Sequence, residues 1–274
     1  MKLFPGSNRP LFLVYIALMG IFLVPAIKAE EALISYENAP TVFVTGASRG
    51  IGFALTKLYA EKGWLVIASC RNPNTASRLN SLGEKYGNVN IEKLDVTNES
   101  DLQAIEAKYE TIPIDVLINN AGMFGPESQQ RLGNLDYTLF RRVTDVNVYG
   151  PLAVSNSLRK SVALSNQKKI IIITSGLGSK TLTKDRGEQY FYRASKAAVN
   201  LIGVVLAADL KDSHVLVGLL NPGIVNTDLQ NDVSYSGPLI EPEEAASALI
   251  KNIESLSEAS NATMLDLDGT PMAW

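Results

Sequence analysis

The chain has 274 residues, of which 46% are hydrophobic and 19% charged, with a formal net charge of −3. This length suits one large α/β domain with a substantial core, and the lack of a long basic run argues against a nucleic-acid partner. Cys70 is the only cysteine, so an internal disulfide is excluded; its place at the end of an apolar run indicates a small buried side chain.

The first 29 residues differ in character from the rest of the chain. Lys2 and Arg9 precede an apolar stretch at residues 11–27, and charged residues follow it. This arrangement is typical of a signal peptide, cleaved after Ala26 or Ala29, and the stretch is also just long enough for a membrane anchor. We expect residues 1–29 to export or anchor the chain and residues 30–39 to form a linker. If the start is mis-assigned, the protein is expected to be cytoplasmic.

Residues 40–274 alternate between strand-like and helix-like patterns. Apolar, strand-like runs occupy Thr41–Thr45, Trp64–Ser69, Val89–Leu94, Val116–Asn119, Ile170–Thr174 and Val215–Leu220. Helix-like stretches include Ile51–Lys62, Asn98–Glu110, Leu135–Ser165 and Arg193–Leu210. The alternation predicts one Rossmann-type, doubly wound parallel sheet flanked by helices. Four consecutive isoleucines, Ile170–Ile173, indicate a strand that is buried on both faces.

A glycine-rich turn joins the first predicted strand to the first predicted helix. It reads Thr45-Gly46-Ala47-Ser48-Arg49-Gly50-Ile51-Gly52. Glycines allow a tight turn and a close approach to a pyrophosphate, and the helix that follows presents free N–H groups to the phosphates. The sequence therefore predicts a dinucleotide site here, with a purely structural turn as the alternative.

The end of the second predicted strand bears on the choice of dinucleotide. A carboxylate there would bind the ribose of NAD, but residues 68–76 contain no acidic residue and include Arg71. Arg71 and Arg49 can hold a phosphate with bidentate hydrogen bonds, which favours NADP(H) over NAD. The alternative is that both arginines are solvated surface residues.

Tyr192 and Lys196 lie four residues apart in a helical pattern and so share one helix face. An ammonium group near a phenol lowers the pKa of the tyrosine from its usual value of about 10 and prepares the pair for acid–base chemistry. The spacing also arises by chance in surface helices. Tyr190 is a rival to Tyr192, but it has no lysine four residues further on.

The order of these motifs resembles the short-chain dehydrogenase/reductase family over residues 41–274. The turn has the pattern Thr-Gly-x-x-x-Gly-x-Gly, and Tyr-x-x-x-Lys lies downstream of it. Further matches are Asp95 and Val96 after the third strand, Asn119-Asn120-Ala121-Gly122 after the fourth, and Asn221-Pro222-Gly223 with Thr227 after the sixth. The segments Ala68–Pro73, Tyr192–Lys196 and Asp266–Trp274 are most similar to the C-factor and sniffer-type carbonyl reductases.

The resemblance implies a set of catalytic and cofactor-binding residues. The catalytic residues would be Asn147, Ser175, Tyr192 and Lys196, with Ser179 as the alternative serine. Tyr192 and Lys196 would also contact the cofactor. The other cofactor contacts would be Gly46, Ser48, Arg49, Gly50, Ile51, Gly52, Arg71, Asp95, Val96, Asn119, Ala121, Gly122, Pro222, Gly223, Val225 and Thr227.

The implied activity is hydride transfer between NADP(H) and a carbonyl compound or secondary alcohol. In the family, the asparagine distorts its helix and helps to hold a water molecule beside the lysine. The resemblance also implies a small-molecule substrate and a homo-oligomer, either a dimer or a tetramer. A non-catalytic dinucleotide-binding or signalling protein on the same fold is the alternative. We expect no metal site, and we expect His214 to lie in a surface loop.

Overall fold

The computed structural model describes residues 39–183, 187–229 and 235–274. Contacts divide the chain into two units, Met1–Ala39 and Pro40–Trp274, and the elements below belong to the second. The predicted leader at residues 1–29 and nearly all of the predicted linker lie outside the described residues.

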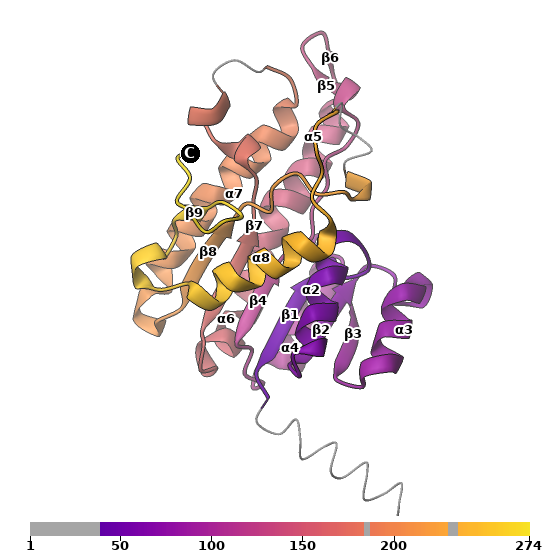
Figure 1. The fold of residues 1–274 in the computed structure, drawn as a ribbon, viewed down its shortest axis with the longest axis vertical. Helices are drawn as coiled ribbons and strands as arrows, with labels where there is room; N and C mark the ends of the chain where they lie inside the picture. Colours follow the sequence, from indigo (N-terminus) through magenta and orange to yellow (C-terminus); the bar gives the residue numbers. More distant parts are fainter. Residues whose placement is uncertain (1–38, 184–186, 230–234) are drawn as a thin grey trace, which may run out of the picture. The chain divides into compact units, whose positions relative to one another are not determined.

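A seven-stranded parallel sheet forms the centre of the second unit, as Figure 1 shows. In sheet order its strands are β3 (Val89–Lys93), β2 (Leu65–Cys70), β1 (Thr41–Thr45), β4 (Val116–Asn119), β7 (Lys169–Ile173), β8 (Leu216–Leu220) and β9 (Met264–Leu265). From β1 the chain adds β2 and β3 toward one edge of the sheet, and from β4 it adds β7, β8 and β9 toward the other edge. The predicted doubly wound fold is therefore confirmed. In such sheets ligands bind beyond the carboxyl ends of the strands, where the order reverses.

Helices cover both faces of the sheet (Figure 1). One layer comprises α2 (Gly50–Glu61), α3 (Ser77–Tyr86) and α8 (Pro242–Ser255). The other comprises α4 (Glu99–Tyr109), α6 (Gly150–Leu164) and α7 (Tyr190–Asp209). A short hairpin of β5 (Gln130–Arg131) and β6 (Asn134–Leu135) lies beyond the carboxyl ends of the strands.

Strand β7 shows why the sheet needs both layers. Ile171 and Ile173 pack in the core under α2 and α8, whereas Ile170 and Ile172 pack in the core under α4, α6 and α7. Successive side chains of a strand point to opposite faces, so an unbroken apolar run is stable only when both faces are covered. The prediction made from the four isoleucines is confirmed.

The predicted helix over Leu135–Ser165 is interrupted in the structure. Helix α5 (Tyr137–Thr144) begins after Asp136, whose carboxylate accepts hydrogen bonds from the N–H groups of Thr138 and Leu139. A π-helical turn, Asp145–Tyr149, then leads into α6. Interruptions of this kind occur often at functional sites.

Among the described residues, α7 alone has the length and apolar composition that could cross a membrane. Half of its most apolar window is buried within the domain, on the α4, α6 and α7 face of the sheet. The helix thereby belongs to the core, and it carries Tyr192 and Lys196 at its first turns.

Candidate active site

A groove of about 900 Å³ lies at the carboxyl ends of β1 to β4. It collects most of the residues predicted to bind a dinucleotide. The turn after β1 and the first residues of α2 supply Gly46, Ser48, Arg49, Gly50 and Ile51, and the segments after β2, β3, β4 and β8 supply Arg71, Asp95, Val96, Ala121, Gly122 and Thr227. Residues that are scattered along the sequence thus share one surface because parallel strands end at the same edge of the sheet.

The glycine turn has the shape that a phosphate requires. Gly46 and Gly50 have φ angles of +68° and +54°, which residues other than glycine rarely adopt. A Cβ atom on Gly52 would lie 2.4 Å from the carbonyl oxygen of Gly46. Helix α2 has no side-chain cap at Arg49 and no acidic residue in its first turn. The positive end of the helix dipole is therefore open to an anion.

Several predicted contacts do not line this groove. The side chain of Asn119 is buried and donates a hydrogen bond to Ser155 of α6 at 3.0 Å. Its neighbour Asn120 lines the groove and donates to the carbonyl oxygen of Thr45 at 2.9 Å, which ties β4 to the turn. The groove is likewise not lined by Gly52, Pro222, Gly223, Val225, Tyr192 or Lys196.

Arginines are slightly more numerous than aspartates among the charged residues that line the groove. Arg71 is exposed after β2, and Arg78 of α3 lies 4.5 Å above the ring of Phe53 and also lines the groove. Arg49 pairs with Asp228 at 3.3 Å, with both side chains well exposed. Sequence reasoning missed Arg78, because its place became evident only once α3 was located beside the groove.

Tyr192 and Lys196 are buried, each 7% exposed, at the start of α7. The Lys196 ammonium group donates to the carbonyl oxygen of Ile173 at 2.9 Å and lies 5.5 Å from the centre of the Tyr192 ring. A Cβ on the groove residue Gly122 would lie 3.9 Å from that ammonium group. The pair therefore borders the groove, at the carboxyl end of β7.

The pKa values of the pair differ from the simple expectation that Lys196 lowers the pKa of Tyr192. Burial raises the pKa of Tyr192 to about 12, and a side-chain hydrogen bond with Ser175 opposes this increase only in part. Burial also lowers the pKa of Lys196 to about 8. Loss of solvation disfavours the charged form of each group, which raises the pKa of the phenol and lowers the pKa of the ammonium group.

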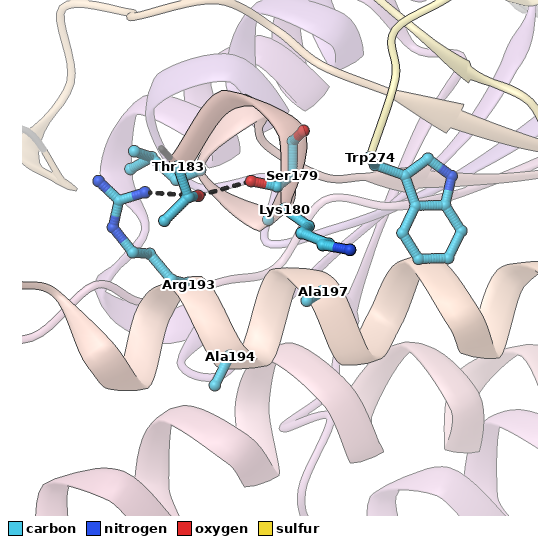
Figure 2. A pocket seen from close by; sticks show the side chains of 9 residues that line it. Ser179, Lys180, Thr183, Arg193, Ala194, Ala197 and Trp274 are labelled. Carbon is cyan, nitrogen blue, oxygen red and sulfur yellow. Dashed lines mark hydrogen bonds between the residues drawn. The ribbon is translucent and has the colours of Figure 1, made fainter. Parts of the chain in front are cut away.

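The two candidate serines have different surroundings. Ser175 follows β7 and interacts with the Tyr192 phenol. Ser179 is fully buried and donates a hydrogen bond to the carbonyl oxygen of Ala273 at 2.6 Å. Figure 2 shows Ser179 in a second pocket beside Arg193, Ala194 and Ala197 of α7. There the Thr183 hydroxyl donates to the carbonyl oxygen of Ser179 and accepts from Arg193. Of these two serines, only Ser175 interacts with Tyr192.

Asn147 lies in the middle of the π-helical turn and is 1% exposed. Its side chain accepts from the N–H of Met123 at 2.9 Å and donates to the carbonyl oxygen of the same residue at 2.8 Å. It also donates to Ser195, whose hydroxyl bonds the carbonyl oxygen of Tyr192. Asn147 thus connects the segment after β4 to the helix that carries the tyrosine and lysine.

The described residues, 39–183, 187–229 and 235–274, contain no cluster of side chains that could bind a metal ion. His214 is exposed after α7 with a φ of 56°. Tyr190 is 42% exposed, in contrast to Tyr192. Tyr192 and Lys196 thus form a buried acid–base pair next to the groove, and Ser175 interacts with the tyrosine, whereas the titratable residues that line the groove itself include Cys70, Asp95 and Asp145.

A doubly wound sheet with an open glycine turn at its first strand–helix junction has the architecture of a Rossmann-type dinucleotide-binding domain. The family model described as short chain dehydrogenase matches residues 40–236. The chain belongs to the short-chain dehydrogenase family.

Individual relatives extend over nearly the whole domain. The 1-hydroxy-2-glutathionyl-2-methyl-3-butene dehydrogenase of Rhodococcus sp. (strain AD45) is 33% identical over 85% of this chain and 99% of its own length. The NADPH-bound carbonyl reductase from chicken fatty liver has a TM-score of 0.79 at 27% identity, covering 86% of this chain and 99% of that one. The carbonyl reductase Sniffer of D. melanogaster has a TM-score of 0.77 at 25% identity, covering 86% and 100%.

Proposed function

We propose that this protein is an NADP(H)-dependent carbonyl reductase that interconverts a small carbonyl compound and a secondary alcohol. The observation that carries the proposal is the buried Tyr192, whose phenol interacts with Ser175 and which has Lys196 four residues later. This group of residues lies beside a groove that suits a dinucleotide. The carbonyl reductases from chicken and fly, one of them bound to NADPH, support it.

The side chains suit the reduction of a carbonyl group, for which NADPH supplies the hydride when it is bound. Ser175 and Tyr192 can donate hydrogen bonds to the carbonyl oxygen, where negative charge develops in the transition state. The pKa of about 12 keeps Tyr192 protonated at neutral pH, so its phenol can act as the general acid. Asn147 and Lys196, which both approach Gly122, would form the route by which the proton is replaced.

The groove fits the phosphates of the same cofactor. The open N-terminus of α2 faces the place where a pyrophosphate would bind. Arg71, Arg78 and Arg49 would hold the additional phosphate that distinguishes NADP from NAD. An acidic residue at the position of Arg71 would instead favour NAD.

The direct test is turnover of aldehydes, ketones and quinones by the full chain, followed through the loss of NADPH absorbance. We expect reduction with NADPH and much slower reduction with NADH. If the protein binds NADPH tightly but reduces none of these compounds, the reductase proposal fails and a non-catalytic binding role gains support.

Arg71→Asp is expected to reverse part of the preference for NADPH. The change removes one cation from the phosphate end of the groove and introduces a carboxylate that repels the phosphate. A charge-assisted hydrogen bond contributes about 1.5–3 kcal/mol, so NADPH affinity should fall about 10- to 100-fold while NADH affinity is kept or improved. Fluorescence titration with both cofactors measures this. Arg159→Asp, the same charge change on α6, should leave both affinities unchanged; equal losses for the two variants would contradict the assignment.

NADPH affinity is expected to fall as pH rises through about 8. Below that pH, Lys196 carries its proton and attracts an anionic ligand; above it, the free chain holds the neutral amine because burial has lowered the lysine pKa. Titrations between pH 7 and about 9.5 should show a several-fold rise in the dissociation constant. Lys196→Met should remove this dependence, and Cys70→Ser, which changes the thiol in the groove lining, should retain it. A pH-independent affinity in the parent protein would refute the prediction.

A further inference from the structure

Gln130 is a buried polar side chain whose hydrogen bonds connect the backbone of Tyr192 with the segment after β4. It lies in β5 of the small hairpin and is 0% exposed. Its amide nitrogen donates to the carbonyl oxygens of Phe124 and Gly125 at 2.9 and 3.2 Å. Its amide oxygen accepts the backbone N–H of Tyr192 at 3.0 Å. One side chain thus joins the segment after β4 to the first turn of α7.

The bond to Tyr192 replaces a helix cap that α7 lacks. Gln189, at the N-cap position, adopts a left-handed conformation and makes no side-chain cap hydrogen bond. The first N–H groups of a helix have no partner within the helix, and Tyr192 supplies one of them. Gln130 therefore acts as a cap from 62 residues away in the sequence.

The other end of Gln130 fixes a ring that packs against the phenol. Phe124 is 2% exposed, and its ring centre lies 4.4 Å from that of Tyr192, with the planes 32° apart. The carbonyl group of Phe124 is one of the two that Gln130 binds. The same amide thus fixes both the backbone of Tyr192 and the aromatic surface beside its ring.

Charged contacts hold the hairpin against the residues that lead into α7. Arg131 pairs with Glu127 at 3.3 Å and with Glu188 at 3.5 Å, and Gln189 donates to Glu127 at 3.4 Å. Glu188 and Gln189 both have positive φ angles, so the chain enters α7 in a strained conformation. The strain is tolerated because the hairpin fixes this entry from outside the helix.

We propose that Gln130 is a positioning residue for the reaction, which orients Tyr192 by binding both the start of α7 and the Phe124 segment. The inference rests on the proposed function, in which Tyr192 donates the proton. A misplacement of about 1 Å at a reacting group costs about 100-fold in rate, so the effect should appear in turnover and not in cofactor binding.

The test compares Gln130→Met with Asn134→Ala in the full chain. Methionine has a similar length but makes none of the three hydrogen bonds. The Asn134 side chain is exposed and donates to the carbonyl oxygen of Ser128, so its loss weakens the hairpin without removing the hydrogen bond to Tyr192. We expect Gln130→Met to lower kcat about 10- to 100-fold with NADPH affinity unchanged, and to increase the isotope effect on kcat seen with deuterated NADPH. Asn134→Ala should retain the parent kcat and isotope effect.

The pH dependence of kcat in Gln130→Glu is an independent test, because it can be measured even if Gln130→Met does not fold. A protonated carboxyl can donate to Phe124 and accept from Tyr192, whereas an ionised one can only accept. Its kcat should therefore approach the parent value at low pH and fall as pH rises and the new carboxyl ionises, a transition that the parent lacks.

The outcomes separate this inference from the proposed function. If the parent protein reduces no carbonyl compound, the proposed function fails. If the parent is active and Gln130→Met matches Asn134→Ala in kcat, or Gln130→Glu has the parent pH profile, the positioning role is refuted. A parallel loss of NADPH affinity in Gln130→Met would likewise overturn it in favour of a general structural role.

Discussion

Tyr192→Phe is expected to lower the rate of carbonyl reduction by about 100- to 10,000-fold while leaving NADPH affinity unchanged. Phenylalanine keeps the ring that packs 4.4 Å from Phe124, so the site keeps its shape. It lacks only the hydroxyl group, which interacts with Ser175 and would donate the proton. Steady-state turnover and fluorescence titration of NADPH measure the two quantities separately.

Tyr190→Phe is the matched control, because it makes the same change two residues earlier on an exposed side chain. We expect it to retain the parent rate. A Tyr192→Phe protein that turns over within tenfold of the parent, or a Tyr190→Phe protein that loses activity, would show that another group supplies the proton.

The second large effect is expected from Gly52→Ala. The added Cβ would lie 2.4 Å from both the Gly46 carbonyl oxygen and the Asn120 side chain, and the first of these belongs to the backbone of the turn. Overpacking of this kind costs about 1–3 kcal/mol of folding free energy. Because the turn must move to make room, NADPH affinity should fall at least about tenfold. Denaturant unfolding and fluorescence titration measure the two changes.

Gly83→Ala provides the comparison for this substitution. Gly83 lies within α3, where a Cβ would meet Ile91 at an ordinary 3.4 Å. Alanine favours a helix over glycine by about 0.8–1.0 kcal/mol, so this change should stabilise the protein or leave it unchanged, with normal NADPH affinity. If Gly52→Ala binds NADPH as well as Gly83→Ala does, the close approach at the turn has no bearing on cofactor binding.

Local patterns predicted the inner sheet well. The bounds of β1 and β4 agree with the sequence, since both strands are short, continuous apolar runs. Helices α3 and α8 and strand β9 were not predicted from the sequence. Strand β9 has only two residues, and α3 buries only Leu79 and Leu82, so these two elements offer few apolar positions from which to recognise them. Helix α8 buries six residues and has an apolar face that could have been recognised.

The site was predictable where a motif is contiguous and missed where contacts join distant segments. The glycine turn could be located because its residues are adjacent. The role of Gln130 could not, because nothing near it in sequence indicates that its amide reaches Tyr192. The raised pKa of Tyr192 was missed for a related reason: burial is a property of the assembled core, and it opposes the effect expected from Lys196.

The π-helical turn at Asp145–Tyr149 limits which deletions and substitutions this segment can accept. In this turn Gly150 donates to the carbonyl oxygen of Asp145, five residues earlier, which is one residue more than an α-helix uses. Deleting a single residue here would give a more regular helix, yet it would rotate Asn147 away from Met123 and Ser195. A deletion within 145–149 is thus expected to improve helical geometry and still be eliminated by selection for activity, whereas substitutions at its exposed positions remain permissible.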